Sequence, residues 1–180
     1  NSLTMTLGNI DVGTDKITLG TGIGNVGTLT HTSGTIIGKF ERWIAATATD
    51  VDFPIGTSSN MHLFTPNFTH LTSGSLIAEY NESDPGSTGL PLSENSLNVT
   101  NQFSDGYWSV SAANGLASID YDIDISGTGF SSYSLYVVTR VIKRTNNVSS
   151  WTLDGTHVNL ANPVAYRTGL SGISTAELAF

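Results

Sequence analysis

Short segments in which apolar and polar residues alternate are the feature that most constrains the fold of this chain. From Lys39 onward turn-forming clusters separate them, and the segments are residues 39–44, 50–56, 74–80, 105–110, 117–125 and 134–144. Successive side chains of a β-strand point to opposite faces, so this alternation buries one face of each strand. No stretch holds the helical period over three turns. The pattern therefore predicts an all-β protein built as an antiparallel β-sandwich.

The first 38 residues carry shorter apolar pairs, separated by glycine and other turn-forming residues. Residues 9–20 and 25–38 resemble each other, since both run from Asn and an aliphatic residue through Gly-Thr to an aliphatic pair and Gly. Such an echo is typical of the rungs of a β-solenoid. We therefore divide the chain into a solenoid-like or strand-donating segment, residues 1–38, and a β-sandwich domain, residues 39–180.

Charge and composition exclude several classes of partner. Acidic residues outnumber basic ones by 15 to 7, and the formal net charge is -8, so the phosphate backbone of nucleic acid is repelled. The apolar runs are far shorter than the roughly 20 residues that a membrane span needs. The chain has no cysteine, which excludes disulfides and thiolate metal sites. We expect neither nucleic acid nor a membrane span.

The spacings that mark common catalytic sites are missing from the sequence. The four histidines are scattered without an HExxH spacing, and no GxSxG elbow occurs. Gly22, Gly24 and Gly27 spell the GxGxxG of dinucleotide-binding folds, but strand-like residues follow where that motif needs a helix. We therefore expect that the protein is not an enzyme and has no catalytic residues.

Three aspartates, Asp120, Asp122 and Asp124, alternate with apolar residues in one predicted strand. They share one face of that strand, with neighbours roughly 6.5 to 7 Å apart. Carboxylate oxygens are ligands that calcium prefers, so calcium is the one cofactor that the pattern suggests. The alternative, which we favour, is a solvent-facing strand whose acids pair with Arg140, Lys143 or Arg144 of a neighbouring strand.

The three tryptophans, Trp43, Trp108 and Trp151, allow two interpretations. Exposed together, they would form a sugar-stacking face for a polysaccharide. Each of them lies within or beside an alternating apolar segment, where a large ring more often fills the core. We expect the core arrangement, and in particular a buried, structural Trp108.

Several segments together carry a family resemblance, namely residues 32–44, 53–59, 105–110, 141–144, 151–158 and 167–174. In this order they resemble a module near the C-terminal end of large secreted surface proteins of Bacteroidetes, ahead of the type IX secretion signal. The resemblance covers nearly the whole chain and implies export to the cell surface or medium, with repetitive neighbours upstream. Such proteins continue into a sorting domain, so a chain ending at Phe180 is read as a processed product or a piece.

The sequence thus favours a non-catalytic structural or adhesive module of an extracellular surface protein. An N-terminal segment such as residues 2–7 offers unpaired backbone groups, which a copy of the chain or a flanking repeat can cover by β-augmentation. Repeated head to tail, that contact produces filaments. The alternative function is that of a carbohydrate-binding module with an aromatic sugar-stacking face.

Overall fold

The computed structural model describes residues 1–180, apart from the side chain of Leu160. Its regular elements are β-strands, and no helix occurs among the described residues. The larger sheet has six strands in the order β11 (Ile142–Arg144), β14 (Thr175–Ala179), β9 (Tyr107–Ala113), β6 (Gly74–Asn81), β4 (Ile36–Ile44) and β2 (Ile10–Leu19). The smaller sheet has four, β12 (Thr156–Ala161), β13 (Val164–Ser171), β10 (Asp120–Ser126) and β5 (Phe64–Phe68). The all-β expectation is confirmed.

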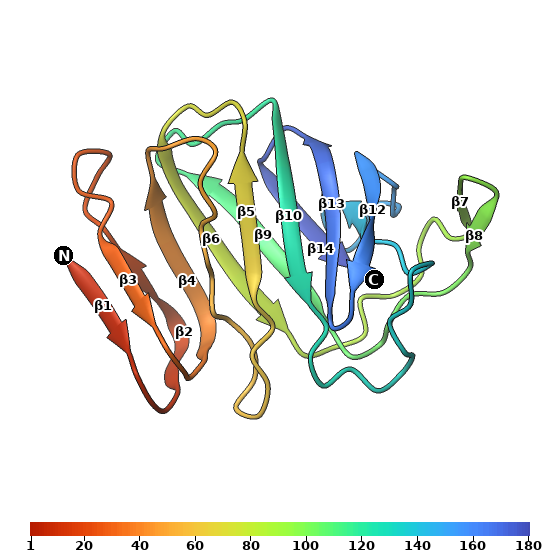
Figure 1. Ribbon diagram of the computed structural model, residues 1–180, viewed down its shortest axis with the longest axis horizontal. Helices are drawn as coiled ribbons and strands as arrows, with labels where there is room; N and C mark the ends of the chain where they lie inside the picture. The colour runs from red at the N-terminus through yellow and green to blue at the C-terminus, as the bar shows by residue number, and fades with distance from the viewer.

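These two sheets pack face to face as a β-sandwich (Figure 1). Strand β10 shows how the sequence specifies its inner face, because Tyr121, Ile123 and Ile125 are buried while the aspartates between them point outward. One buried apolar cluster contains side chains from both sheets. A fully covered Trp108 lies in this cluster, with its indole Nε1 donating to the carbonyl of His62 at 2.9 Å. Its ring packs 5.3 Å from that of Phe180, between centroids.

The N-terminal strands are stacked in parallel and not as hairpins. Strand β1 (Ser2–Met5) pairs with β3 (Thr28–His31), and β2 pairs with β4, both in parallel. We call β1 with β2 the first rung and β3 with β4 the second. Ser2 lies opposite Thr28 and Ile10 opposite Ile36, the same offset, but the register shifts after Asp11, so that Leu19 lies opposite Arg42. The rungs therefore pair in a different register from the one suggested by the sequence echo, which aligns Asn9 with Asn25.

The rungs belong to the same packed body as the sandwich. The expected boundary after residue 38 falls inside β4, which is a strand of the larger sheet. Met5 of β1 and Leu19 of β2 are 3% and 2% exposed and join the main buried cluster. The N-terminal segment thus extends the sandwich and shares its core.

The turns that connect the two strands of each rung depend on a close approach between two glycines. Gly34, between β3 and β4, has φ +95°, a conformation that costs a residue with a Cβ about 1 to 2 kcal/mol. A Cβ at this position would also overlap the carbonyl oxygen of Gly8, in the equivalent turn of the preceding rung. Glycine therefore lets the two turns stack directly.

The outer edge of the rungs lies at one end of the longest axis of the molecule (Figure 1). Within the described part of the chain, no strand pairs with the outer edge of β1 or of β2. The small hairpin of β7 (Leu92–Glu94) and β8 (Leu97–Val99) marks the opposite end. At the other edge of the larger sheet, Lys143 of β11 exchanges backbone hydrogen bonds with Thr152. The end of the molecule at β1 and β2 therefore has more unpaired strand edge than the end at β11.

Candidate functional site

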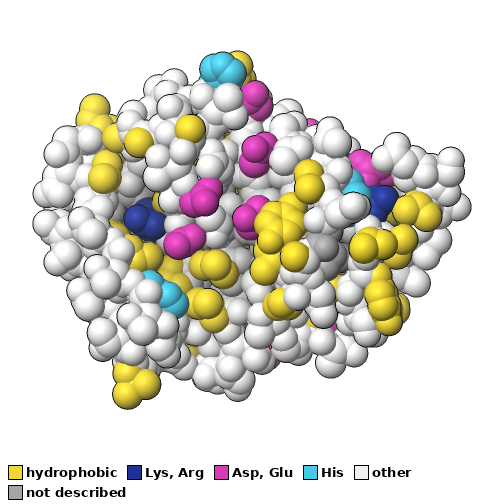
Figure 2. Space-filling model, in the orientation of Figure 1, with side chains coloured by type: hydrophobic (Ala, Val, Ile, Leu, Met, Phe, Trp, Pro, Cys, Tyr) yellow, Lys and Arg dark blue, Asp and Glu magenta, His cyan; other side chains and the backbone are white. Residues whose placement is uncertain are grey.

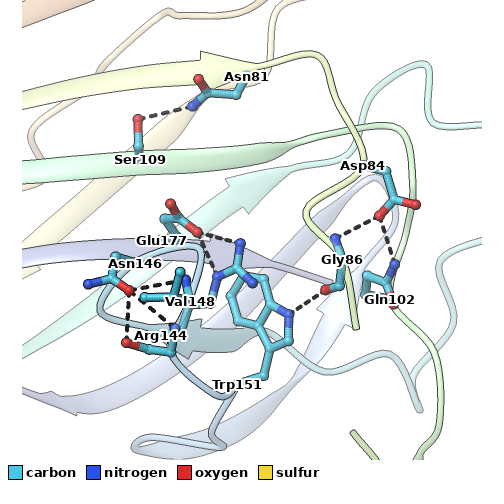
Figure 3. A network of polar contacts seen from close by, with 11 residues as sticks. Asn81, Asp84, Gly86, Gln102, Ser109, Arg144, Asn146, Val148, Trp151 and Glu177 are labelled. Atoms are coloured by element: carbon cyan, nitrogen blue, oxygen red, sulfur yellow. Dashed lines mark hydrogen bonds and ion pairs between the residues drawn. The ribbon is translucent and has the colours of Figure 1, made fainter. Parts of the chain in front are cut away.

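Two of the three tryptophans are held inside the protein. Trp108 is 0% and Trp151 is 1% exposed, while Trp43 is half-buried. Trp151 donates to the carbonyl of Gly86 at 2.7 Å, and the guanidinium of Arg144 lies 4.1 Å from the centre of its ring (Figure 3). The expectation of a buried Trp108 is confirmed. A sugar cannot stack on Trp108 or Trp151 in this conformation, because other side chains already cover both rings.

The network around Trp151 has a structural role. In Figure 3, Arg144 of β11 is bound by Glu177 of β14, with 2.6 Å between guanidinium and carboxylate. The indole of Trp151 ties this pair to the loop that contains Asp84 and Gly86. The network therefore fastens the β11 edge and two loops to the larger sheet.

The three aspartates of β10 point outward as expected but do not converge on one point. Asp120 bonds to the imidazole Nδ1 of His70 at 2.8 Å, and Asp122 accepts from the backbone amide of Gly169 at 2.8 Å. The pKa of Asp124 is raised by burial and then by the charge of Asp50, in the β4–β5 connection. Among the described residues, no three acidic or histidine side chains are grouped so that they could hold a metal ion.

The basic residues expected to pair with these aspartates have other partners. Arg140 forms an ion pair with Glu94 at 2.7 Å, Lys143 with Asp154 at 2.7 Å, and Arg144 with Glu177. The expectation was wrong because β11 lies in the larger sheet, whereas β10 lies in the smaller one. A sheet assignment of this kind is decided by the packing of the whole chain.

Acidic side chains gather in the middle of the face shown in Figure 2, with a basic side chain beside them. Burial, followed by repulsion from Asp50, Asp122 and Asp52, raises the pKa of Asp124 to about 6. Asp50 and Asp52 accept hydrogen bonds from Asn67 and Thr65 of β5, which fixes their carboxylates beside Asp124. Burial and the neighbouring carboxylates thus favour the protonated form of Asp124.

A pocket of about 320 Å³ lies at the β7–β8 end of the molecule. Its apolar lining comes from β8, from the connection between β8 and β9, from the loop that precedes β11 and from the end of the chain. It includes Phe103, Tyr133, Tyr136, Val138 and Phe180. The side chains of this loop are unusually exposed, 50% for Tyr133 and 64% for Tyr136. Figure 2 shows hydrophobic side chains beside a basic one at this end. The size fits the lower range of small-molecule sites.

Arg140 lines the same pocket and belongs to a buried group with an excess of positive charge. Arg140 and Arg167 are 4% and 0% exposed at their side chains, and both bind the single carboxylate of Glu94. Burial alone would raise the pKa of Glu94, but the hydrogen bonds and charges of the two arginines lower it. Burial, and then the charge of Arg140, lowers the pKa of the nearby His157. Two guanidinium groups thus share one carboxylate.

Sequence reasoning missed this pocket because it assigned residues 134–144 to one alternating strand. Only Ile142–Arg144 form a strand, and Tyr136, Val137 and Val138 are all exposed in the preceding loop. Three consecutive exposed apolar residues break the period of two, since one face of a strand should be buried. The cluster of aromatic and β-branched residues after a serine-rich turn was the available signal.

Comparison of the chain with protein-family models, with curated proteins and with solved structures finds no match. No helix long and apolar enough to cross a membrane is found in the part of the chain that the structure describes.

Proposed function

We propose that the protein is a non-catalytic structural or adhesive module of an extracellular surface protein, and that it associates with copies of itself through its N-terminal strands. The unpaired outer edge of β1 and β2 carries this proposal. Such an edge offers a row of free amides and carbonyls, to which a further strand can bind. The parallel pairing of β1 with β3 and of β2 with β4 supports the proposal, because the chain itself already adds strands in parallel at this end.

The proposed contact is head to tail, which means that the open rung at one end of the long axis (Figure 1) binds a different surface of the next copy. A contact between two different surfaces repeats without closing unless the rotation forms a ring. Head-to-tail association therefore predicts elongated assemblies that grow with concentration, whereas pairing of two edges would stop at a dimer.

A charge placed on the edge tests the proposal. Thr4 is an exposed residue of β1, and a lysine there should block strand addition without entering the core. We expect Thr4→Lys to remain folded and to lose the concentration-dependent increase in particle size measured by light scattering and electron microscopy. Ser87→Lys, at an exposed loop position, is the matched control and should assemble like the parent chain. An intact chain that stays monomeric at high concentration contradicts the proposal.

The second candidate is carbohydrate binding, and the exposed tyrosines favour it. Tyr133 and Tyr136 line the pocket and offer partly exposed aromatic rings where the buried Trp108 and Trp151 do not. Sugar rings stack on such surfaces, and Tyr combines an apolar face with a polar hydroxyl. A pull-down on insoluble polysaccharides tests it. Binding that is lost in Tyr136→Ala and kept in Val148→Ser, an exposed residue outside the pocket, supports this candidate.

A further inference from the structure

We infer that the pocket bounded by β8 and the loop before β11 binds an acidic saccharide, with Tyr133 and Tyr136 contacting the sugar ring and Arg140 receiving its carboxylate. This inference rests on the carbohydrate-binding candidate above and names the class of sugar and the groups that select it. It is independent of association through β1 and β2, which lie at the opposite end of the molecule (Figure 1).

The aromatic side chains shape the apolar part of the pocket. Phe103 packs edge-on against Tyr133 with 5.3 Å between ring centroids, and it also packs against Phe180 at 5.6 Å. These contacts hold Tyr133 while half of its surface stays exposed. Tyr136 adds a second, more exposed ring from the same loop. An apolar surface with two partly exposed aromatic rings suits the apolar face of a sugar.

Polar groups surround this floor. Asn98 and Asn101 line the pocket and are exposed, so their carboxamides can both donate to and accept from hydroxyl groups. The phenol hydroxyls of the two tyrosines have the same double capacity. A purely apolar ligand would leave these groups without new partners, whereas a hydroxyl-rich ligand uses them.

The two buried arginines favour a negatively charged ligand. Arg140 and Arg167 are balanced by one carboxylate, that of Glu94, in a chain whose net charge is -8. Arg140 forms an ion pair with Glu94, whose carboxylate lies 2.7 Å from Nε, and its Nη1 donates to the carbonyl of Val137. The side chain of Arg140 lines the pocket. A guanidinium has five N–H donors in a fork that matches a carboxylate. A sugar carboxylate supplies the charge that balances the second arginine.

The test compares acidic sugars with neutral forms of the same shape. Isothermal titration calorimetry on the full chain would use trigalacturonic and trimannuronic acid, each beside its methyl ester, at low and high salt. We expect at least one acid to bind roughly tenfold or more tightly than its ester, because an ester loses a charged hydrogen bond. The preference should weaken at high salt.

Variants assign the effect to the pocket. Val138→Ser, inside the pocket, should weaken binding of the acid, and the matched exposed residue outside it, Val148→Ser, should not. Arg140→Gln leaves Arg167 paired one to one with Glu94, and should bind acid and ester equally. Should Arg140→Gln fail to fold, Tyr136→Ala serves instead, since its side chain is largely exposed; it should lose both ligands.

The outcomes separate this inference from the carbohydrate-binding candidate on which it rests. Equal affinity of acid and ester, lost in Tyr136→Ala, overturns the selection of an anion and leaves carbohydrate binding standing. Binding that survives both Val138→Ser and Tyr136→Ala places the ligand elsewhere and overturns the site. No binding of any of the four sugars overturns the inference, whatever the intact chain and Thr4→Lys show in light scattering.

Discussion

At the scale of single residues, Trp108 makes a large contribution to stability that its sequence context already suggested. It is fully covered, hydrogen-bonded to the carbonyl of His62, and surrounded by aromatic rings. We expect Trp108→Ala to lower the free energy of unfolding by about 3 to 5 kcal/mol, through lost burial and a residual cavity. Chemical denaturation measures this. Trp43→Ala, at a half-buried ring, is the control and should cost clearly less; equal losses would contradict the assignment.

Asp124 shows the opposite effect, a residue whose ionised form opposes folding. Burial, and then Asp50, Asp122 and Asp52, raises its pKa to about 6, above the ordinary 3.8, so the folded state holds the proton more tightly than the unfolded chain. Its ionisation therefore lowers stability above pH 6, and the penalty fades as pH falls toward 4. We expect Asp124→Asn to melt higher than the parent chain at pH 8, with a gap that narrows on acidification.

The pH series for Asp124→Asn needs a control for simple loss of charge. Asp15, exposed in β2, provides it, and Asp15→Asn should not reproduce the pH-dependent gap in melting temperature. A gap for Asp124→Asn that widens toward acid would mean that the carboxylate stabilises the fold, contrary to its acidic surroundings.

At the scale of elements, the two rungs depend on the stacked turns at Gly8 and Gly34. We expect Gly34→Ala to destabilise the protein by more than the about 1 to 2 kcal/mol that a positive φ costs a residue with a Cβ, because its methyl group also overlaps a carbonyl oxygen. The control is Gly115→Ala, whose φ of +85° is similar but whose added Cβ meets nothing within 4 Å. Thermal unfolding should separate the two, and equal losses would show that the turns adapt.

At the scale of the whole molecule, the shared core predicts that rungs and sandwich unfold together. Met5 and Leu19 are buried in the same cluster as the strands of both sheets. We expect a single calorimetric transition whose calorimetric and van't Hoff enthalpies agree. Removing residues 1–12 should lower its midpoint, because it exposes the inner rung and takes Met5 from the core. Two separate transitions would mean that the N-terminal segment is an independent unit.

The sequence alone was enough for the fold class and for the inner faces of individual strands. Alternation with a period of two is a local property, so Tyr121, Ile123 and Ile125 could be assigned to one buried face and the aspartates between them to the other. The burial of Trp108 followed from the same pattern. The strand-rich character of the first 38 residues was equally visible in their short apolar pairs.

The tertiary structure alone decided how distant segments meet. Which sheet holds β11, and hence that Arg144 binds Glu177 and not an aspartate of β10, depends on pairing between residues far apart in the chain. The register of the rungs has the same origin, since the turns at Gly8 and Gly34, far apart in the chain, stack on each other beside the pair Ile10 and Ile36. The pocket at Arg140 needs residues from β8, the loop before β11 and the chain end together. Local alternation carries no information about such contacts, because the packing of the whole chain sets them.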